Sequence, residues 1–274
     1  MLTAGRRLDF GPTPLVMGIV NVTPDSFSDG GIYFEPRTAI AGALRMAADG
    51  AAIIDVGGES TRPGAEPLEA AVEIERVVPV IRGIRAASDV PISIDTMKSS
   101  VAWAALDAGA DIVNDVTALR FDAEMVSLVR TRGVPVILMH MRGEPRTMQQ
   151  DIRFHDVVEE VAAELQERVD AALSAGIERE QIAVDPGIGF GKTFEQNLLL
   201  LRDAARFTAI GPLVIGGSRK GFIGQLTGQP GGAVRAAGSL ATVAAAAMAG
   251  AAIVRVHDVR ETVDFLKVWS AIEM

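Results

Sequence analysis

The sequence predicts an α/β protein with the (β/α)8 barrel, or TIM barrel, fold and a short N-terminal extension. Eight short apolar runs recur along the 274 residues, amphipathic segments of helical period separate them, and the units follow one another without a linker. We therefore expect a single domain over residues 1–274, in which residues 1–14 lack a βα partner and form a hairpin or plug at the bottom of the barrel. An open doubly wound sheet, which can also hold eight strands, is the alternative.

The predicted strands are apolar runs bounded by turn residues. Their apolar residues are largely continuous rather than alternating, which is typical of parallel strands covered on both faces. The strands are predicted at residues 15–22, 51–57, 91–96, 111–116, 135–140, 182–186, 212–217 and 252–257.

Alanine-rich amphipathic segments lie between the strands and include residues 36–50, 68–87 and 154–176. Several of them end in glycine after Ala or Asp, which is the expected helix stop. The last predicted helix covers residues 260–274, and the segment 233–250 is apolar enough for either the core or an interface between subunits.

Composition argues against several classes of protein. Without cysteine the chain holds no disulfide, thiolate nucleophile or zinc–cysteine site, which fits the cytoplasm. No apolar run approaches the roughly 18 residues of a membrane span, and no basic segment precedes an apolar one at the start, so we expect no membrane or targeting segment. A net charge of −9 without a Lys/Arg run argues against nucleic acid, so a few placed cations must hold any anionic substrate.

Polar residues occupy the carboxyl ends of the predicted strands, where the active site of such a barrel lies. An unpaired charge in a buried strand is costly, so the repetition of this pattern is informative. The polar residues at these ends are Asn21, Asp55, Asp95, Asn114, Asp115, His140, Asp185, Ser218, Arg219, Lys220, Arg255 and His257.

Asp95, Asn114 and Asp185 come from three strands and would converge in the barrel. Two carboxylates and an amide suit a flat heterocycle that carries several N–H groups and a carbonyl. Lys220 can donate to a ring nitrogen or carbonyl, and Phe190 offers an apolar wall.

The segment "DPGIGFGK" (185–192) follows one of these strands. Its glycines would let the backbone approach the ring closely while Asp185 faces it. The segment lacks the spacing of a Walker A phosphate loop, so we do not interpret it as one.

Arg255 and His257 alternate on the last strand, so their side chains share a face. With Asn21, Thr61 and Arg62 they form a candidate site for a phosphate or an oxyanion, because an arginine fork and neutral donors match phosphate oxygens. The loops 22–35 and 57–67 are rich in Gly, Pro, Ser and Asp, and we expect them to close over a substrate.

Some of these polar residues have a structural interpretation instead. Asp55 and Asp115 would hydrogen-bond loop backbone, and His140 would pack and donate to a neighbouring carbonyl. For Arg255, a salt bridge inside the barrel is the alternative to an anion site.

Eight segments, in order along nearly the whole chain, resemble the motifs of the dihydropteroate synthase family. They are "MGIVNVTPDSFSDGG" (17–31), "IDVGGESTRPGA" (54–65), "ISIDTMK" (92–98), "NDV" (114–116), "LMHMRGEPRTMQ" (138–149), "DPGIGFGKTFEQNLLLL" (185–201), "SRKGFIGQLTG" (218–228) and "RVHDV" (255–259). The resemblance implies a pterin-binding barrel of folate biosynthesis. That enzyme joins 6-hydroxymethyl-7,8-dihydropterin diphosphate to 4-aminobenzoate, giving 7,8-dihydropteroate and diphosphate.

The resemblance also implies roles for residues that match the family's motifs. The implied pterin site consists of Asp95, Asn114, Met139, Asp185, Phe190 and Lys220. The implied diphosphate site consists of Asn21, Thr61, Arg62, Arg255 and His257, and Asn21 would also link the protein to a Mg²⁺ cofactor. The 4-aminobenzoate site, for which sulfonamides compete, would be bordered by Phe27, Pro63, Ser218 and Lys220. The implied catalytic residues are Asp29, Lys220, Arg255 and His257.

The family further implies small-molecule substrates, a homodimer through the late helices, and departure of the diphosphate before the aminobenzoate attacks. Three other functions compete with this reading. They are a corrinoid-dependent methyltransferase, which has no need for the "NVTPDSFSDGG" loop, a pterin-binding paralogue without turnover, and a Schiff-base aldolase that uses Lys220.

Overall fold

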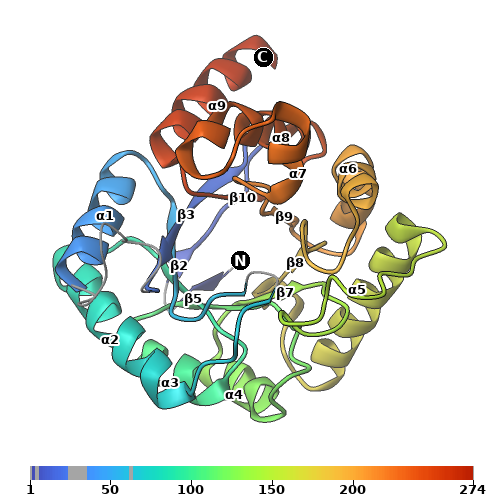
Figure 1. Cartoon of the computed structure of the whole chain (residues 1–274). Coiled ribbons are helices and arrows are strands. Elements are labelled where there is room, and N and C mark those ends of the chain that lie inside the picture. The colour runs from blue at the N-terminus through green and yellow to red at the C-terminus, as the bar shows by residue number, and fades with distance from the viewer. Residues whose placement is uncertain (1, 4–5, 24–35, 62–63, 274) are drawn as a thin grey trace.

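The computed structural model describes all residues except 1, 4–5, 24–35, 62–63 and 274. Its eight parallel strands form a barrel, which confirms the predicted fold and rules out the open sheet (Figure 1). The strands are hydrogen-bonded in the order β8-β7-β6-β5-β4-β3-β10-β9, and Val184 N, which donates to Pro212 O at 2.9 Å, joins the two ends. The strands are β3 Leu15–Asn21, β4 Ile53–Gly57, β5 Ile92–Asp95, β6 Ile112–Asp115, β7 Val136–Met139, β8 Ile182–Asp185, β9 Val214–Ile215 and β10 Ile253–Val256.

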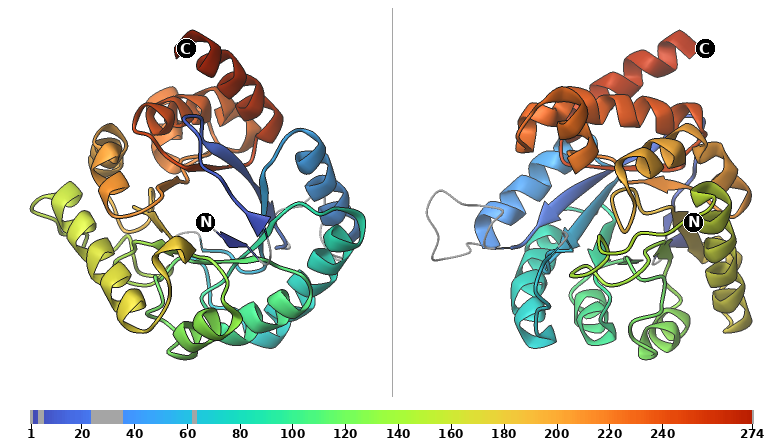
Figure 2. Two further views of the ribbon diagram at one scale, coloured as in Figure 1. Left: turned by 180° about the vertical axis from the view of Figure 1, so that it is seen from behind. Right: turned by 45° about the vertical axis from the view of Figure 1, so that its right-hand side comes forward.

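Helices follow the strands and form a ring around the barrel, as Figure 2 shows from two further sides. Those predicted from the sequence begin and end within a few residues of their expected positions. In the described part of the chain, no helix is long and apolar enough to cross a membrane. The helices are α1 Pro36–Ala48, α2 Ala70–Ala87, α3 Ser99–Asp107, α4 Glu124–Arg132, α5 Val157–Ser174, α6 Phe194–Arg202, α7 Gly221–Thr227, α8 Ala236–Met248 and α9 Val259–Glu273, with short 3-10 turns at Arg179–Gln181, Ala204–Ala209 and Gly232–Arg235.

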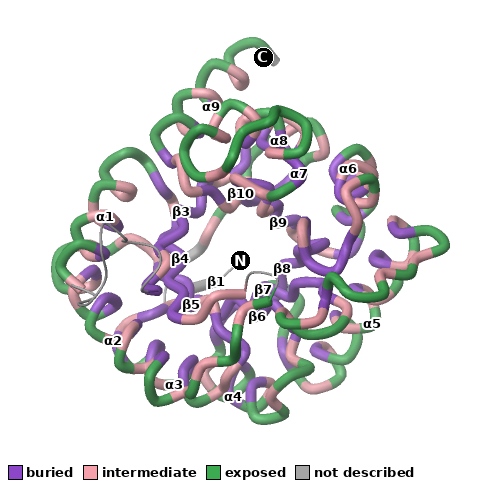
Figure 3. Tube along the Cα trace, in the orientation of Figure 1, coloured by how far each residue is buried: buried purple, intermediate pink, exposed green. Residues whose placement is uncertain are grey.

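Alternate residues of each strand point to the inside and the outside of the barrel. On β3, Val16 and Val20 belong to the large core between the barrel and the helices, whereas Met17 belongs to a separate cluster that also contains Ile53 and Ile112. Both faces of the strands are therefore buried (Figure 3), and this explains the continuous apolar runs in the sequence.

The inward-pointing positions change from apolar to polar along the strands. The lower positions form the inner apolar cluster, and on four strands the next inner position, two residues on, carries a charge or an amide. The successive inner pairs are Ile53 and Asp55, Ile112 and Asn114, Ala183 and Asp185, and Ile253 and Arg255. The barrel interior thus has an apolar layer below and a polar layer above, at the carboxyl ends.

The N-terminal extension closes the apolar end of the barrel. Strands β1 (Leu2–Thr3) and β2 (Arg6–Arg7) pair antiparallel, and the following Leu8 and Phe10 pack against the inner apolar cluster. This arrangement confirms the predicted hairpin and plug.

We expect Ile53→Ala to lower the free energy of unfolding by about 2–5 kcal/mol, because it leaves a cavity in the inner apolar layer. Ile53 is fully buried, whereas Val72 on α2 is 38% exposed and provides the matched control. Val72→Ala should change the free energy of unfolding by no more than about 0.5 kcal/mol. Urea denaturation measures both, and equal effects of the two substitutions would contradict the layered interior.

Candidate active site

A buried guanidinium joins two strand-end carboxylates inside the barrel. Arg255 Nε lies 2.6 Å from Asp55 Oδ2, and Arg255 Nη2 lies 2.6 Å from Asp95 Oδ2. Asn114 Nδ2 donates to the same Asp55 oxygen at 3.3 Å. Four strands, β4, β5, β6 and β10, are thereby tied together at the polar layer.

The electrostatics of this group follow from burial. Burial alone would lower the pKa of Arg255, but the charges of Asp55 and Asp95 raise it above its ordinary value. Burial raises the pKa of Asp95 to about 7, although the charge of Arg255 opposes the shift. Among the described residues, Asp55 Oδ1 and Asp95 Oδ1 are buried without a hydrogen-bond partner. Unsatisfied carboxylate oxygens at the carboxyl ends of barrel strands are suited to accept N–H groups of a ligand.

The predicted convergence of Asp95, Asn114 and Asp185 agrees with the strand register. Asp95 lies opposite Asn114 on the neighbouring strand, and Asp185 lies opposite Met139. Burial raises the pKa of Asp185, while a 2.7 Å hydrogen bond from Gly187 N and nearby cations, Arg255 among them, counteract the shift. The structure therefore brings the predicted side chains of Asp95, Asn114 and Asp185 to the same inner layer as Arg255.

The structural interpretation of Asp55 as a partner of loop backbone is wrong, because its carboxylate binds Arg255 and Asn114. The alternation of side chains along β4 could have identified Asp55 as a partner of Arg255, since both side chains point into the barrel at the same layer. The interpretation of Asp115 is confirmed, because its oxygens accept hydrogen bonds from Thr117 N and Leu119 N.

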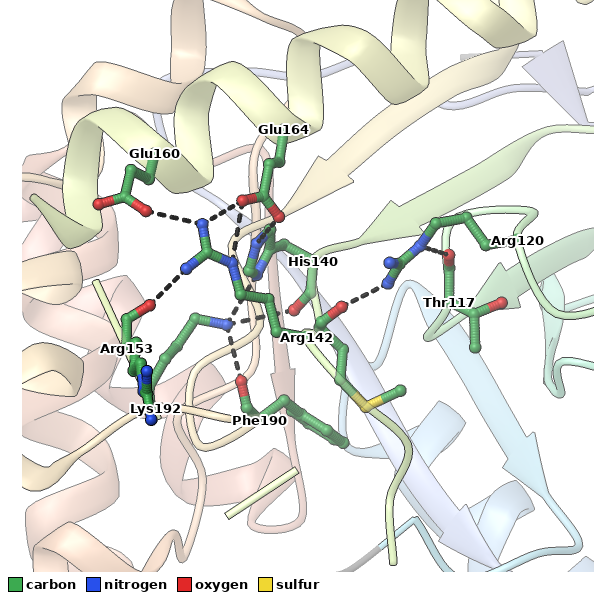
Figure 4. A network of polar contacts seen from close by, with 10 residues as sticks. Thr117, Arg120, His140, Arg142, Arg153, Glu160, Glu164, Phe190 and Lys192 are labelled. Carbon is green, nitrogen blue, oxygen red and sulfur yellow. Dashed lines mark hydrogen bonds and ion pairs between the residues drawn. The ribbon is translucent and has the colours of Figure 1, made fainter. Parts of the chain in front are cut away.

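His140 does not donate to a carbonyl, as the sequence had suggested. Its Nε2 lies 3.0 Å from Glu164 Oε2 and its Nδ1 lies 2.9 Å from Lys192 Nζ, as Figure 4 shows. Both ring nitrogens are instead occupied by charged side chains, Glu164 and Lys192, which are distant in the sequence.

The loop after β8 is shaped by three glycines with left-handed backbone, with φ of 69° at Gly187, 86° at Gly189 and 62° at Gly191. A Cβ atom on Gly187 would lie 1.9 Å from His140 O, and one on Gly189 would lie 3.0 Å from the Lys220 side chain. Glycine is thus required for close approach as well as for φ. This loop presents Phe190, whose ring has Lys220 Nζ 4.1 Å above it.

Ser218 and His257 form a second polar group at the carboxyl ends. Ser218 Oγ lies 3.0 Å from His257 Nδ1 and accepts a hydrogen bond from His257 N at 3.2 Å. Burial and the charge of Arg219 lower the pKa of His257 to about 3, so its ring is neutral at physiological pH. If Ser218 donates to Nδ1, the ring proton is on Nε2, where it can serve a ligand.

Two further predicted site residues, Asn21 and Thr61, lie at the carboxyl ends of neighbouring strands. Asn21 ends β3 and Thr61 follows β4, and both are half-buried. Phe27, Asp29, Arg62 and Pro63 lie outside the described residues.

A buried charge cluster holds the loop after β4, which sequence reasoning missed. Lys98 Nζ lies 2.6 Å from both Glu59 Oε2 and Glu73 Oε2, and Leu68 N donates to Glu59 Oε1 at 2.8 Å. A cavity of about 310 Å³ lies beside this cluster, lined in part by Met97, Thr117 and Met141. The cluster therefore anchors both flanks of the loop that carries Thr61.

The fold and the charged layer define a (β/α)8-barrel enzyme that binds a small polar ligand at the carboxyl ends of its strands. The family model for pterin binding enzymes matches residues 17–257, and the chain belongs to this family. It is 46% identical to the dihydropteroate synthase of Synechocystis sp., over 99% of this chain and 94% of the relative.

Solved structures agree with this assignment. The Xanthomonas albilineans dihydropteroate synthase with 4-aminobenzoic acid has a TM-score of 0.89 and 47% identity, covering 95% of this chain and 93% of that one. The same enzyme in complex with 7,8-dihydropteroate has a TM-score of 0.86 and 44% identity, with coverages of 95% and 94%. The Yersinia pestis dihydropteroate synthase with a sulfonamide drug has a TM-score of 0.93 and 40% identity, with coverages of 100% and 98%.

We expect Gly187→Ala to lower the free energy of unfolding more than Gly133→Ala does. Both glycines have similar φ, 69° and 63°, so the cost of a left-handed alanine, about 1–2 kcal/mol, is common to the two variants. A Cβ on Gly133 meets nothing within 4 Å, whereas one on Gly187 strikes a carbonyl oxygen. Urea denaturation should show that Gly187→Ala loses about 1 kcal/mol or more beyond the loss in Gly133→Ala. This difference measures the close approach of Gly187 to the His140 carbonyl. Equal losses would show that the loop can move away from His140.

Proposed function

We propose that this chain catalyses the dihydropteroate synthase reaction. The amino nitrogen of 4-aminobenzoate forms a bond to the methylene carbon of 6-hydroxymethyl-7,8-dihydropterin diphosphate, the bond from that carbon to the diphosphate oxygen breaks, and the nitrogen loses a proton. The observation that carries the proposal is the inner layer of Asp95, Asn114 and Asp185 around Arg255, in a pterin binding enzyme. The dihydropteroate synthases of known structure that bind 4-aminobenzoic acid and 7,8-dihydropteroate support it.

The pterin would lie on the polar layer. Asp95 and Asp185 accept its N–H groups, Asn114 can donate and accept, and Lys220 donates to a ring nitrogen or carbonyl. Met139 and Phe190, which belong to one buried apolar cluster, line the ring.

The diphosphate would be bound by Asn21, Thr61, Arg62, Arg255 and His257. Because Nε and Nη2 of Arg255 already bind carboxylates, Arg255 contributes its remaining N–H donors and its positive charge. The neutral His257 acts as a hydrogen-bond donor rather than as a cation. These groups favour departure of the diphosphate, because they stabilise charge that develops on the leaving oxygen. The positive charge left behind can delocalise into the pterin ring.

A Mg²⁺ ion fits this site as a ligand of the substrate. Mg²⁺ keeps several waters and takes few protein oxygens when substrate phosphates supply the others. Among the described residues no group of three or more His, Cys, Asp or Glu could hold a metal, whereas Asn21 ends β3 with an amide oxygen at the barrel mouth. Asn21 would therefore bind Mg²⁺ that the diphosphate brings, and the ion would neutralise the leaving charge.

The second substrate would enter beside Ser218 and Lys220, with Phe27 and Pro63 completing its site and Asp29 near the reacting centre. Sulfonamides would compete for this position, as the Yersinia pestis structure with such a drug supports. We also propose a cytoplasmic homodimer through the late helices. Exposed apolar side chains there support it, and they are Leu226, Val234, Met248, Val268 and Ile272.

Release of diphosphate from the pterin substrate tests the proposal. We expect diphosphate and dihydropteroate to appear together when Mg²⁺ and 4-aminobenzoate are present, and the activity to disappear when a chelator removes Mg²⁺. Asp185→Asn and Arg255→Ala should each lower kcat/KM by about a hundredfold or more, because they remove buried charges at the reacting substrate. Asp170→Asn, an exposed aspartate on α5, is the control. Binding of the pterin without release of diphosphate would identify a pterin binder instead.

The pKa of Asp95 predicts a pH dependence of substrate binding. Burial raises this pKa to about 7, so the carboxyl of the free protein becomes protonated as the pH falls through that value. A pterin that needs the carboxylate must displace this proton, so its KM should rise towards about tenfold per pH unit on the acid side. Steady-state kinetics measure this change, and Asp95→Asn should show a high KM without it. A wild-type KM that stays constant below pH 7 would contradict the assignment of Asp95 as an acceptor.

A further inference from the structure

A lysine lies buried behind the loop that presents Phe190. Lys192 is 2% exposed, and its Nζ lies 2.8 Å from Phe190 O, 2.9 Å from His140 Nδ1 and 3.2 Å from His140 O. Figure 4 shows these contacts converging on the Lys192 ammonium from His140, which follows β7, and from Phe190. A fully buried cation is costly, so its retention calls for a role.

The contacts specify the protonation of the whole group. An ammonium has three N–H donors, and the two carbonyls and Nδ1 are three acceptors when the proton of His140 is on Nε2. Nε2 can then donate to Glu164 Oε2 at 3.0 Å. Burial and the charge of Lys192 lower the pKa of His140 to about 4, and the hydrogen bond from His140 lowers that of Glu164 to about 2. A chain therefore runs from a cation through a neutral imidazole to a carboxylate.

The chain ends on α5, where Arg142 fixes the carboxylate. Arg142 Nε donates to Glu164 Oε1 at 2.9 Å, and Arg142 Nη2 donates to Glu160 Oε2 at 2.7 Å. The position of Lys192 is thus set in part by a helix outside the barrel, through His140 and Glu164.

The ammonium clamps both sides of the glycine-rich turn. His140 N donates to Asp185 O at 2.8 Å, and the His140 carbonyl is packed against Gly187 and also accepts from Lys192. The other clamped carbonyl belongs to Phe190. The charge of Lys192 also counteracts the effect of burial on the pKa of Asp185. One cation therefore contacts the backbone of the apolar wall and favours the ionised form of the ring acceptor.

We propose that Lys192 is a positioning residue for the pterin ring, which holds Phe190 and the Asp185 carboxylate in place through the chain to His140 and Glu164. The inference rests on the proposed function, because it concerns the same pterin site. It assigns Lys192 no contact with the substrate. It separates Lys192 from Lys220, the lysine above the Phe190 ring, which faces the substrate.

Binding of 6-hydroxymethyl-7,8-dihydropterin diphosphate, measured by titration calorimetry without 4-aminobenzoate, tests the proposal. Lys192→Met keeps the aliphatic length and removes the three hydrogen bonds. We expect Kd to rise about tenfold or more, because the ring contacts lose their fixed geometry. The KM for 4-aminobenzoate should stay within about twofold of the wild-type value, because Lys192 contacts the backbone of His140 and Phe190, neither of which is assigned to the 4-aminobenzoate site.

Arg85→Met is the matched control for loss of a partly buried cation. Arg85 binds Asp111 and the carbonyls of Ser88 and Gly109, next to the amino ends of β5 and β6 and away from the polar layer. It should lower thermal stability and leave the pterin Kd unchanged. This result would separate positioning from general destabilisation.

Glu164→Gln provides a second variant that alters no group of the loop. It replaces the acceptor of His140 by an amide that can also donate, which weakens the preference for the Nε2 proton and so for a charged Lys192. We expect a smaller rise of the pterin Kd in the same direction. In the Lys192→Met background Glu164→Gln should add no further rise, because the chain is already broken.

The dependence of pterin affinity on pH shows whether the charged form of Lys192 is needed or whether a neutral side chain of the same length suffices. Burial lowers the pKa of Lys192 to about 7, and the charged or titratable groups that face it are His140, Arg142, Glu164, Asp185 and Lys220. Pterin affinity of the wild type should fall as the pH rises through this value, and Lys192→Met should lose this alkaline limb while keeping the acid one.

The outcomes separate the inference from the proposed function. A wild-type protein that does not bind the pterin overturns the proposed function itself. A wild type that binds, with an unchanged Kd in Lys192→Met, overturns the role of Lys192. If Lys192→Met does not fold, Glu164→Gln decides, and a wild-type Kd and pH profile in that variant overturn the proposal.

Discussion

The ion pair of Arg255 with Asp55 and Asp95 is the interaction on which the polar end of the barrel depends. It joins β10 to β4 and β5 across the interior, where the side chains are largely removed from water. Removing one partner would leave an uncompensated buried charge, which costs about 3–5 kcal/mol in other proteins. The two carboxylates together carry more negative charge than one guanidinium neutralises, and each has one oxygen without a hydrogen-bond partner among the described residues. The layer is therefore prepared for a ligand that brings N–H donors.

Stability and chemistry are separated along the same strands. The inner apolar cluster, with Leu8 and Phe10 packed against it, occupies the lower half of the barrel, and the charged residues occupy the upper half. A step of two residues on one strand, such as that from Ile253 to Arg255, moves from one region to the other. Burying these charges lowers the stability of the fold, and the close packing of the lower halves and outer faces of the same strands offsets this loss. The supporting groups, Lys192 behind one loop and Lys98 behind another, extend the same principle to the loops.

Much of the fold and part of the site could be predicted from the sequence. The strands were found because parallel strands that are covered on both faces give continuous apolar runs, and the inner phase of each strand followed from the alternation of side chains. That phase correctly placed Asp95, Asn114 and Asp185 in one layer. It also placed Arg255 there, and the salt bridge inside the barrel is what the structure shows.

The partners of charged residues could not be predicted in the same way. Asp55 and Arg255 are 200 residues apart, and only closure of the barrel brings them together. His140 meets Glu164 and Lys192 because α5 and the loop after β8 both pack against the end of β7, which no local pattern encodes. The roles of Asn21 and Thr61 were inferred from their neutral donors near the ends of two strands and from the resemblance, and they remain proposals.

The most direct test of the account is a crystal structure of this chain with 7,8-dihydropteroate. The account predicts that the pterin ring lies on the polar layer, with its N–H groups on Asp95 and Asp185, while Arg255 keeps its bond to Asp55. A pterin ring bound instead in the cavity beside Met97 and Met141, or an Arg255 that leaves both carboxylates to contact the ligand, would contradict it.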